Sequence, residues 1–535
     1  MRLIKFLTAL LLTAAFCYAL NRSFPGSQSA IPALGQLFCP FTGFWQNAEG
    51  KSSLSDRQFN FPELSAPVKV YFDQRKVPHI FADNLKDAVC VQGYVTARDR
   101  LFQMDLSTRA AAGRLSEMLG ARTLEFDKRQ RRIGMVMAAE NTLKNWEKNP
   151  DDLELIQSYV KGINTYISSL SPRDYPVEYK LLDFSPELWT PMRCALLMKN
   201  MDLTLCAREE DLETTNVLQA LGRETFDYLY PLFNPKTSPI IPADREWDFE
   251  PLNVYNDSLS KPMFGEYRHR VLDEVPDNIG SNNWAVDGSK TASGNPILCN
   301  DPHLRLTLPS IWYEVQFHLA ESNFYGVSLP GFPGVVIGFN KDIAWGMTNA
   351  ALDLLDWYKI QWQDDQKSKY LYDGQVKEVL YKIEPYKVKG QADVMDTVRY
   401  TVWGPIAYDD PESSHYDLAI RWLPHQAGGS AIQTFKGLSK ATNYDQYRSS
   451  LNNFRTPPQN IVFASKEGEI ALTIQGQFPM RRPEQGRFVL DGSTSESAWK
   501  GTIPIKHNPS IRNPESGFVS SANQRSTGPS YPYNY

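Results

Sequence analysis

The residues best able to do chemistry lie where the sequence changes from helical to strand-like patterning, in the segments Gly280-Ser281-Asn282-Asn283-Trp284 and Asn300-Asp301-Pro302-His303-Leu304. A serine hydroxyl becomes a useful nucleophile only when a base accepts its proton. No Gly-x-Ser-x-Gly elbow, P-loop or His-Glu-x-x-His motif occurs in the sequence. A Ser-His-Asp hydrolase that uses one of the seven histidines stays open, although it lacks its usual local signature. Taken alone, a Gly-Ser pair is most typical of an exposed turn.

Longer motifs on both sides of Ser281 resemble the penicillin acylase (penicillin amidase) family of N-terminal nucleophile (Ntn) amidohydrolases. Segments 78–84 (PHIFADN), 92–104 (QGYVTARDRLFQM) and 109–117 (RAAAGRLSE) resemble that family's helical α subunit. Segments 330–334 (PGFPG), 338–346 (GFNKDIAWG) and 513–517 (NPESG) resemble its β subunit. The resemblance implies an α+β fold, in which a four-layer αββα sandwich carries a mostly helical N-terminal part.

The resemblance also implies that Ser281 becomes the first residue of a new chain. The precursor would cleave itself between Gly280 and Ser281, and the freed α-amine of Ser281 would act as the base. An α-amine titrates at about pH 8, so a useful fraction of it is unprotonated at neutral pH. A glycine before the cleaved bond suits the tight geometry of an N-to-O acyl shift. We therefore expect a zymogen whose α and β chains come from one precursor.

Four further positions match catalytic residues of the family. His303 matches a residue beside the nucleophile that orients the amine, and Asn349 matches the residue whose backbone N–H helps to form the oxyanion hole. Asn460 matches the side-chain oxyanion donor, and Arg481 matches an arginine that supports Asn460 and the amine. The alternative interpretations are a turn asparagine at 460 and a surface arginine at 481.

A structural calcium (Ca²⁺) site is implied as well. Asp353, the backbone carbonyl of Leu355 and Asp356 resemble the family's calcium loop, and Glu213 aligns with a ligand from the α subunit. Carboxylate and carbonyl oxygens are the ligands that calcium prefers. Other acidic residues at 209–211 lie close to Glu213. Without the resemblance, an Asp-x-x-Asp pattern is typical of a solvated turn.

The substrate class follows from two positions in the expected acyl pocket. Leu304 and Ile337 resemble positions that are aromatic in penicillin G-type members of the family. Aliphatic side chains suit a flexible alkyl chain better than an edge-packed phenyl ring. We expect hydrolysis of N-acyl amides with aliphatic or fatty acyl groups, as in acyl-homoserine lactones. The alternative from another class is a non-catalytic, exported acyl-binding pseudoenzyme of the same fold.

The elements that must position these residues form regions of different character. Residues 21–66 are expected to be an extended lead-in, and residues 67–225 the helical α-subunit region, which opens with two short strands over 67–82. Asp83 or Asn84 can cap a helix toward Asp99, and a second helical pattern ends at Gly120. The irregular stretch 226–280 is expected to be a spacer. Residues 281–535 are expected to be an incomplete Ntn-hydrolase core, truncated at its C-terminus, because the β subunits of the family that it resembles continue further.

Composition agrees with a large exported enzyme. The 535 residues are 42% hydrophobic, with a net charge of −5 and a mean hydropathy of −0.41. These values exclude wholesale disorder and a polytopic membrane protein, and they do not favour nucleic acid binding. Arg2 and Lys5 flank an apolar run, so residues 1–20 are expected to be a signal peptide or a membrane anchor facing the periplasm. Among six scattered cysteines a Cys194–Cys206 disulfide is conceivable, with free thiols as the alternative.

Overall fold

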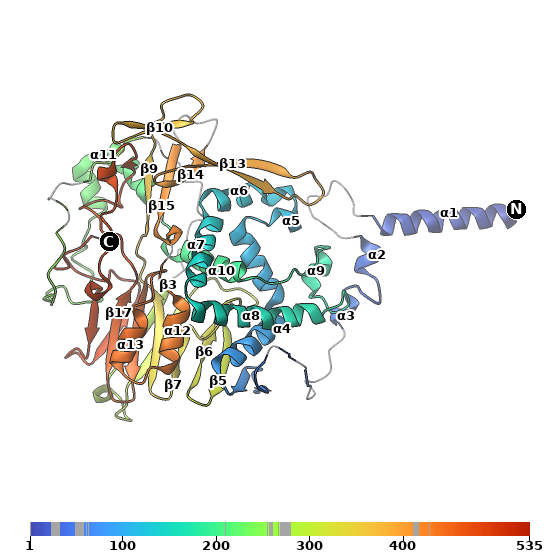
Figure 1. The fold of residues 1–535 in the computed structure, drawn as a ribbon, viewed down its shortest axis with the longest axis horizontal. Coiled ribbons are helices and arrows are strands. Elements are labelled where there is room, and N and C mark those ends of the chain that lie inside the picture. The colour runs from blue at the N-terminus through green and yellow to red at the C-terminus, as the bar shows by residue number, and fades with distance from the viewer. Residues whose placement is uncertain are drawn as a thin grey trace.

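The computed structural model describes residues 2–22, 33–48, 58–59, 61–62, 64–208, 210–253, 255, 260–265, 267, 280–409, 417–426 and 428–534. A helical part and a strand-rich part lie side by side, with the N-terminal helix projecting from the body (Figure 1). The predicted α+β class is therefore confirmed. Parts of the predicted lead-in and spacer, including residues 268–279 directly before the expected cleavage site, fall outside the described residues.

The helical part is built around one long helix, α4 (Leu85–Ala112). The Asn84 side chain caps it by accepting a hydrogen bond from the Asp87 N–H, and Gly113 ends it with φ 61°. The sequence predicts two helices over this range, whereas the structure has one that runs past Asp99. The other helices of this part are α5 (Ser116–Leu119), α6 (Leu124–Arg132), α7 (Met135–Glu147), α8 (Pro150–Ser169), α9 (Val177–Leu181), α10 (Pro191–Cys206) and α11 (Glu210–Leu229).

A nine-stranded sheet forms the centre of the strand-rich part. Its strands, in spatial order, are β1 (Lys69–Phe72), β2 (Pro78–Ala82), β5 (Tyr313–Leu319), β6 (Asn323–Ser328), β7 (Ile337–Asn340), β8 (Ile343–Asn349), β16 (Gln459–Ser465), β17 (Ile470–Gln475) and β19 (Ser510–Arg512). The antiparallel pair β1–β2 confirms the two strands expected over 67–82, and β2 joins β5 in parallel. The helical part therefore contributes two strands to the sheet that continues after residue 280.

Three smaller sheets complete the strand-rich part. The sheet that carries the candidate site consists of β20 (Phe518–Ser521), β3 (Gly280–Val286) and β4 (Ile297–His303). A six-stranded sheet contains β12 (Leu380–Tyr386), β13 (Val394–Thr401), β14 (Gly404–Asp409), β15 (Asp417–Trp422), β9 (Leu355–Lys359) and β18 (Leu490–Asp491). The third is the hairpin of β10 (Lys369–Tyr372) and β11 (Gln375–Glu378).

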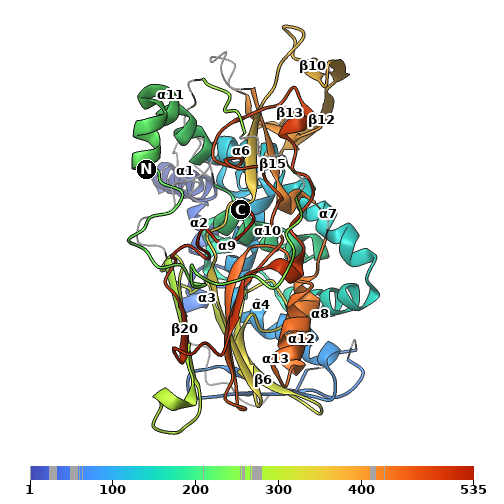
Figure 2. The ribbon, with the colours of Figure 1, turned by 90° about the vertical axis from the view of Figure 1, so that its left-hand side faces the viewer.

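Side-chain alternation on β16 separates the two faces of the large sheet. Phe463 packs against Tyr447 of α13 (Tyr444–Leu451), with ring centroids 4.6 Å apart. Asn460, which points to the opposite face, hydrogen-bonds to Ser521 of β20. Figure 2 shows α13 and its neighbour α12 (Ala431–Lys440) on one side of the sheet and β20 on the other. The small sheet therefore stacks on the large one, with helices on the outer face.

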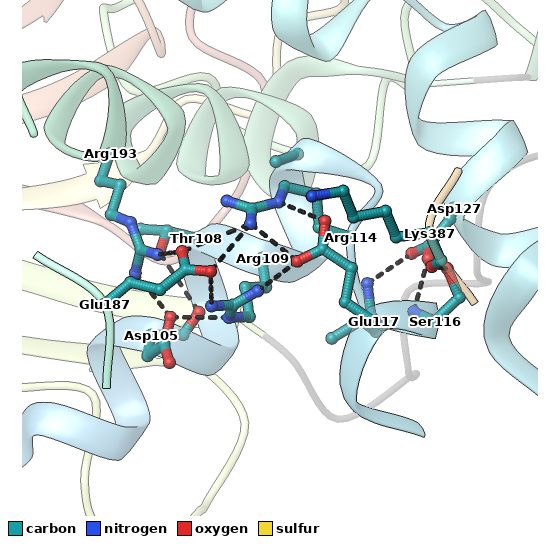
Figure 3. Close-up of polar contacts among 12 residues, drawn as sticks. Asp105, Thr108, Arg109, Arg114, Ser116, Glu117, Asp127, Glu187, Arg193 and Lys387 are labelled. Atoms are coloured by element: carbon teal, nitrogen blue, oxygen red, sulfur yellow. Dashed lines mark hydrogen bonds and ion pairs between the residues drawn. The ribbon is translucent and has the colours of Figure 1, made fainter. Parts of the chain in front are cut away.

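A buried network of charged side chains holds the helical part together (Figure 3). We call it the Arg109 network, and its members are Asp105, Arg109, Arg114, Glu117, Glu187 and Arg193. The buried Arg109 guanidinium pairs with Asp105 at 2.9 Å, Glu117 at 2.7 Å and Glu187 at 2.9 Å. Arg114 and Arg193 pair with the same carboxylates. Three guanidinium groups thus balance three carboxylates that come from α4, α5 and the segment before α10.

Residues 33–48, within the predicted lead-in, form a segment that is partly helical rather than extended. It contains the short helices α2 (Leu34–Leu37) and α3 (Trp45–Ala48), because aromatic rings pack on one another here: Phe44 lies 5.5 Å from Phe38 and 4.2 Å from Trp45. The helix before it, α1 (Arg2–Leu20), is apolar and long enough to cross a membrane, and no part of it is buried. All six cysteines are free, so the Cys194–Cys206 disulfide does not form.

Candidate active site

Ser281 lies at the start of β3, the middle strand of the small sheet. Its side chain is buried, and its Oγ donates a hydrogen bond of 2.6 Å to the carbonyl oxygen of Gly280. Asn523, which follows β20, donates from Nδ2 to the carbonyl oxygen of Ser281 at 2.9 Å. The hydroxyl of Ser281 therefore lies directly against the peptide bond that the sequence predicts to be cut.

The residue before Ser281 has little room for a side chain. A Cβ atom at Gly280 would lie 2.9 Å from Nδ2 of Asn523 and 3.9 Å from Nδ1 of His303. His303 is the partner of Gly280 in the β3–β4 register, and its Nε2 lies 2.8 Å from Oδ2 of Asp301. The structure thus places His303 opposite the expected cleavage site. A larger residue at 280 would displace the Asn523 side chain that holds Ser281.

Asn349 and Asn460 meet at the junction of β8 and β16. Nδ2 of Asn460 lies within hydrogen-bonding distance of the Asn349 carbonyl oxygen at 3.2 Å, of Thr348 Oγ1 at 3.3 Å and of Ser521 Oγ at 3.0 Å. The backbone oxygen of Asn460 accepts a 2.9 Å hydrogen bond from Asn283, two residues after Ser281. The predicted oxyanion residues are therefore fixed to each other and to the strand that carries Ser281.

An apolar cavity opens beside Ser281. Leu304 and Ile337, the two residues predicted for the acyl pocket, both line it, as do Ser281 and Asn349. Most of the remaining wall is apolar or aromatic and comes from α10, the segment before β5, the 329–336 loop, β8, α12 and the 454–459 segment: Met198, Met201, Leu205, Trp312, Leu329, Phe332, Val336, Met347, Ala431, Phe435, Phe454 and Pro457. Such a cavity suits a hydrophobic group attached to a bond held at Ser281.

Arg481 lies away from Asn460 and among the predicted calcium ligands. Its Nη2 donates to Oδ2 of Asp353 at 3.1 Å, to the Leu355 carbonyl oxygen at 3.2 Å and to Oδ1 of Asp356 at 2.8 Å. The sequence predicts that Arg481 supports Asn460, but no hydrogen bond joins these two in the part of the chain that the structure describes. Two buried carboxylates attract a guanidinium more strongly than a neutral amide does.

The acidic residue that reaches this cluster from α11 is Asp211, whereas Glu213 is exposed. Burial, with the charges of Asp353 and Asp356, raises the pKa of Asp211 well above its usual range. Burial also raises the pKa of Asp353 to about 7, against the attraction of Arg481. We call Asp211, Asp353, Asp356 and Arg481 the Arg481 cluster. The structure therefore places Asp211, rather than Glu213, beside Asp353 and Asp356.

The Arg481 cluster has the chemistry of a cation site. The buried Asp211 and Asp356 and the partly buried Asp353 have one guanidinium among them, and Oδ2 of Asp211 is buried without a hydrogen-bond partner. Excess carboxylate oxygen of this kind fits a hard cation such as calcium. Within the described ranges, however, no three acidic, histidine or cysteine side chains already surround one point, and Arg481 donates to three of the predicted donor oxygens. A bound cation would therefore share these oxygens with Arg481.

Two residues of the site, Asn523 and Asp211, are not among the residues assigned to it from the sequence. Asn523 lies 242 residues after Ser281 and reaches it only because β20 pairs with β3. Asp211 is one of several neighbouring acidic residues, and only the orientation of α11 decides which of them is buried. The spacing Asp-x-Glu at 211–213 indicates that α11 can direct either Asp211 or Glu213 into the cluster, because positions two apart on a helix face different sides.

The chain is similar to known proteins in sequence. The family model described as penicillin amidase matches residues 67–535, and the chain therefore belongs to the penicillin amidase family. The solved thermostable penicillin G acylase from Alcaligenes faecalis aligns with 48% of this chain and 46% of its own, at 23% identity and a TM-score of 0.42.

Curated relatives carry acylase names. The acyl-homoserine lactone acylase QuiP of Pseudomonas aeruginosa is 30% identical over 482 residues, which cover 88% of this chain and 56% of that protein. The penicillin acylase 2 proenzyme of a Pseudomonas species is 30% identical over 483 residues, which cover 88% of this chain and 60% of that protein. The penicillin G acylase of Escherichia coli is 26% identical over 511 residues, covering 86% and 60%. The chain thus spans little more than half the length of these relatives.

Proposed function

We propose that this chain carries the nucleophile and acyl pocket of a self-processing amidohydrolase that acts on N-acyl amides. The observation that supports this most is the position of Ser281, whose Oγ lies 2.6 Å from the Gly280 carbonyl oxygen at the edge of an apolar cavity. A serine so placed can attack first the bond before it and later an acyl group held in that cavity.

Processing begins with attack of Ser281 Oγ on the carbonyl carbon of Gly280. The C–N bond between the two residues breaks, the proton of the hydroxyl passes to the departing nitrogen, and Gly280 becomes an ester on Oγ. Water then hydrolyses the ester, which leaves a carboxylate on Gly280 and a free α-amine on Ser281. The 2.6 Å hydrogen bond between the Ser281 hydroxyl and the Gly280 carbonyl oxygen supports this step, because it keeps the two groups in contact.

Turnover uses the freed amine as the base. It accepts the proton of Oγ as the hydroxyl attacks the substrate's amide carbonyl, and it returns that proton to the leaving amine. The backbone N–H of Asn349 and the side chain of Asn460 stabilise the oxyanion, a contribution of the order of 10²–10³ in rate for one donor. His303, which lies opposite residue 280, orients the amine. Water releases the acyl group from Ser281.

The substrate's acyl group is aliphatic. The cavity wall combines Leu304 and Ile337 with flexible methionines such as Met198, which adapt to an alkyl chain. An N-acyl-homoserine lactone and a medium-chain acyl anilide should be hydrolysed faster than a phenylacetyl anilide. A strong preference for the phenylacetyl compound would contradict this assignment.

A calcium ion would have a structural role at the Arg481 cluster, whose carboxylates come from α11, β9 and the loop before β9. Asp211, Asp353, Asp356 and the carbonyl oxygen of Leu355 would hold it. When bound, the ion supplies positive charge to buried carboxylates and takes no part in catalysis. The protein is exported, with α1 acting as a signal peptide or as a membrane anchor that leaves the body in the periplasm.

The nucleophile is tested with Ser281→Ala and Ser281→Cys, beside Ser289→Ala as a matched control. Ser289 is exposed on the 3₁₀ turn that follows β3. Ser281→Ala should remain one chain without amidase activity, whereas Ser289→Ala should mature and turn over normally. Ser281→Cys retains a nucleophile and should still be cleaved. Normal activity of Ser281→Ala would overturn the assignment, and a stable, uncleaved, inactive wild type would indicate the pseudoenzyme.

A further inference from the structure

Residues 33–48, which we call the aromatic foot, form a small folded unit at the base of α1 (Figure 1). Its first helix, α2, lies directly against the end of α1. A Cβ atom at Gly35 would lie 2.9 Å from Oδ1 of Asn21 and 3.2 Å from the carbonyl oxygen of Leu20. The foot is therefore held at the level where α1 ends.

Polar contacts join the other side of the foot to the body of the protein. Nζ of Lys180, on α9, donates to the carbonyl oxygen of Gly43 at 3.1 Å and to Oδ1 of Asn47 at 2.7 Å. Nδ2 of Asn47 donates to the carbonyl oxygen of Tyr175 at 3.0 Å. The foot thus has a polar side, whose hydrogen bonds are made to the helical part.

The outer side of the foot is aromatic and uncovered. Phe38, Phe41 and Trp45 are 49%, 77% and 49% exposed. Phe44 lies between two of these rings and holds them in one cluster. Three large exposed apolar side chains on sixteen residues form a surface that water does not favour.

The neighbouring α1 indicates what covers this surface. Its 19 residues would extend about 28 Å, close to the thickness of a bilayer's hydrocarbon core. Arg2 and Lys5 at its beginning favour a cytoplasmic N-terminus. At its other end the Arg22 guanidinium lies 4.7 Å from the Tyr18 ring centroid, a pair typical of a membrane–water interface. The foot begins at that same level.

We propose that the aromatic foot seats in the outer interfacial layer of the lipid bilayer around α1 and holds the helical part against the membrane. The inference depends on the membrane-anchor form of the proposed function. Tryptophan and other aromatic rings are favoured at headgroup level, where an apolar face can leave water while polar groups stay hydrated. The exposed rings meet the lipid, and Lys180 with Asn47 transmits that attachment to α9.

Trp45 is a natural reporter of this contact, because α1 contains no tryptophan. The full chain is reconstituted into phosphatidylcholine vesicles, some of whose lipids carry a doxyl quencher near the headgroup. The quencher should reduce tryptophan emission, and Trp45→Phe should remove most of the quenched component. Trp362→Phe is the matched control, because Trp362 is bridged to β10 on the far side of the body, and it should retain the quenching (Figure 1).

Phe41→Ser tests the surface without removing the reporter. Phe41 is the most exposed of the three rings, so its replacement leaves the hydrogen bonds of Lys180 intact. The variant should still float with the vesicles through α1, while lipid quenching of Trp45 falls and quenching by aqueous iodide rises. Unchanged values in both measurements would overturn the proposal.

The outcomes separate the foot from the anchor. A wild-type chain that does not float with vesicles would overturn both the membrane-anchor role of α1 and the contact of the aromatic foot with lipid. A chain that floats, but whose Trp45 is quenched by iodide and not by doxyl lipid, would overturn the foot alone. A Trp45 shielded from both quenchers would show that protein covers the surface, which also contradicts the lipid assignment.

Discussion

The Arg109 network and the Arg481 cluster differ in how far the charge of their carboxylates is balanced by guanidinium groups. Both bury carboxylates at a junction between elements, the first among α4, α5 and α10 and the second between α11 and β9. The first has three guanidinium groups for three carboxylates, whereas the second, among the described residues, has one for three. Arg421 adds a more distant favourable charge to Asp356, and Glu210 adds an unfavourable one to Asp353.

The difference appears in the acidity of the carboxyl groups. In the Arg109 network, partial burial of Glu187 is outweighed by Arg109, Arg114 and Arg193, which lower its pKa to about 2. In the Arg481 cluster, burial raises the pKa of Asp353 to about 7. A junction whose own side chains balance its charge needs no added ion once the protein has folded. A junction with excess carboxylate gains stability from an added cation.

The largest expected effect comes from removing the central cation of the balanced network. Arg109→Met removes the guanidinium that pairs with all three carboxylates, which should lower the free energy of unfolding by about 3–5 kcal/mol. Denaturant unfolding measures this change in the free energy of unfolding. The matched control is Arg75→Met, whose exposed pair with Glu314 should contribute about 1 kcal/mol or less. Equal losses in the two variants would contradict the account.

Removing the cation of the unbalanced cluster should have a smaller effect that depends on calcium. Arg481→Met leaves Asp353 and Asp356 unpaired, and the variant should be clearly less stable than wild type in chelator. Calcium should then restore more of the melting temperature in the variant than it adds to the wild type. If calcium does not reduce the loss of stability in Arg481→Met, the comparison is contradicted, because Arg481 alone would then balance the carboxylates of the cluster.

Calcium should raise the stability of the wild type itself by a moderate amount. At about a hundredfold excess over its dissociation constant, a ligand that binds only the folded state adds about 2.7 kcal/mol. Asp211→Asn should abolish this gain, whereas Glu213→Gln should retain it, because only Asp211 is buried in the cluster. Thermal unfolding with and without calcium measures both. If Glu213→Gln abolishes the gain and Asp211→Asn retains it, the calcium ligand on α11 is Glu213, as the sequence predicts.

The smallest effect is a pH dependence of the Arg109 network. The pKa of Glu187 is lowered on folding, so its contribution to stability is fully present above about pH 4.5 and is lost as the pH falls toward about 2. The difference in unfolding free energy between wild type and Glu187→Gln should therefore be constant from pH 7 to pH 5 and shrink below that. A difference that changes between pH 7 and pH 5 would contradict the lowered pKa.

Local features of the fold could be predicted from the sequence. The β1–β2 pair, the Asn84 cap and the change from helices to strands all follow from short-range patterns. The predicted break near Asp99 is wrong, since α4 continues through that residue and its helical pattern never stops before Gly113. Helix length here depends on packing along the whole of α4 rather than on one polar position.

The candidate site shows where sequence patterns stop being sufficient. Ser281 and Leu304 lie in recognisable motifs and Ile337 lies directly beside one, and the structure brings all three to one cavity. The positions of Asp211 and Arg481 could not be predicted, because both depend on contacts between elements far apart in the chain. A shift of two residues turns a helical side chain through more than half a circle, which is why Asp211 is buried and Glu213 is not.

The most direct test of the central claim is the intact mass and N-terminal sequence of the protein produced from its complete reading frame. The account predicts two chains, one of which begins Ser281-Asn282-Asn283-Trp284. Ser281→Ala, prepared in parallel, should give one uncut chain. An active wild type that remains a single chain, or a Ser281→Ala variant that is still cut before residue 281, would contradict an N-terminal serine nucleophile.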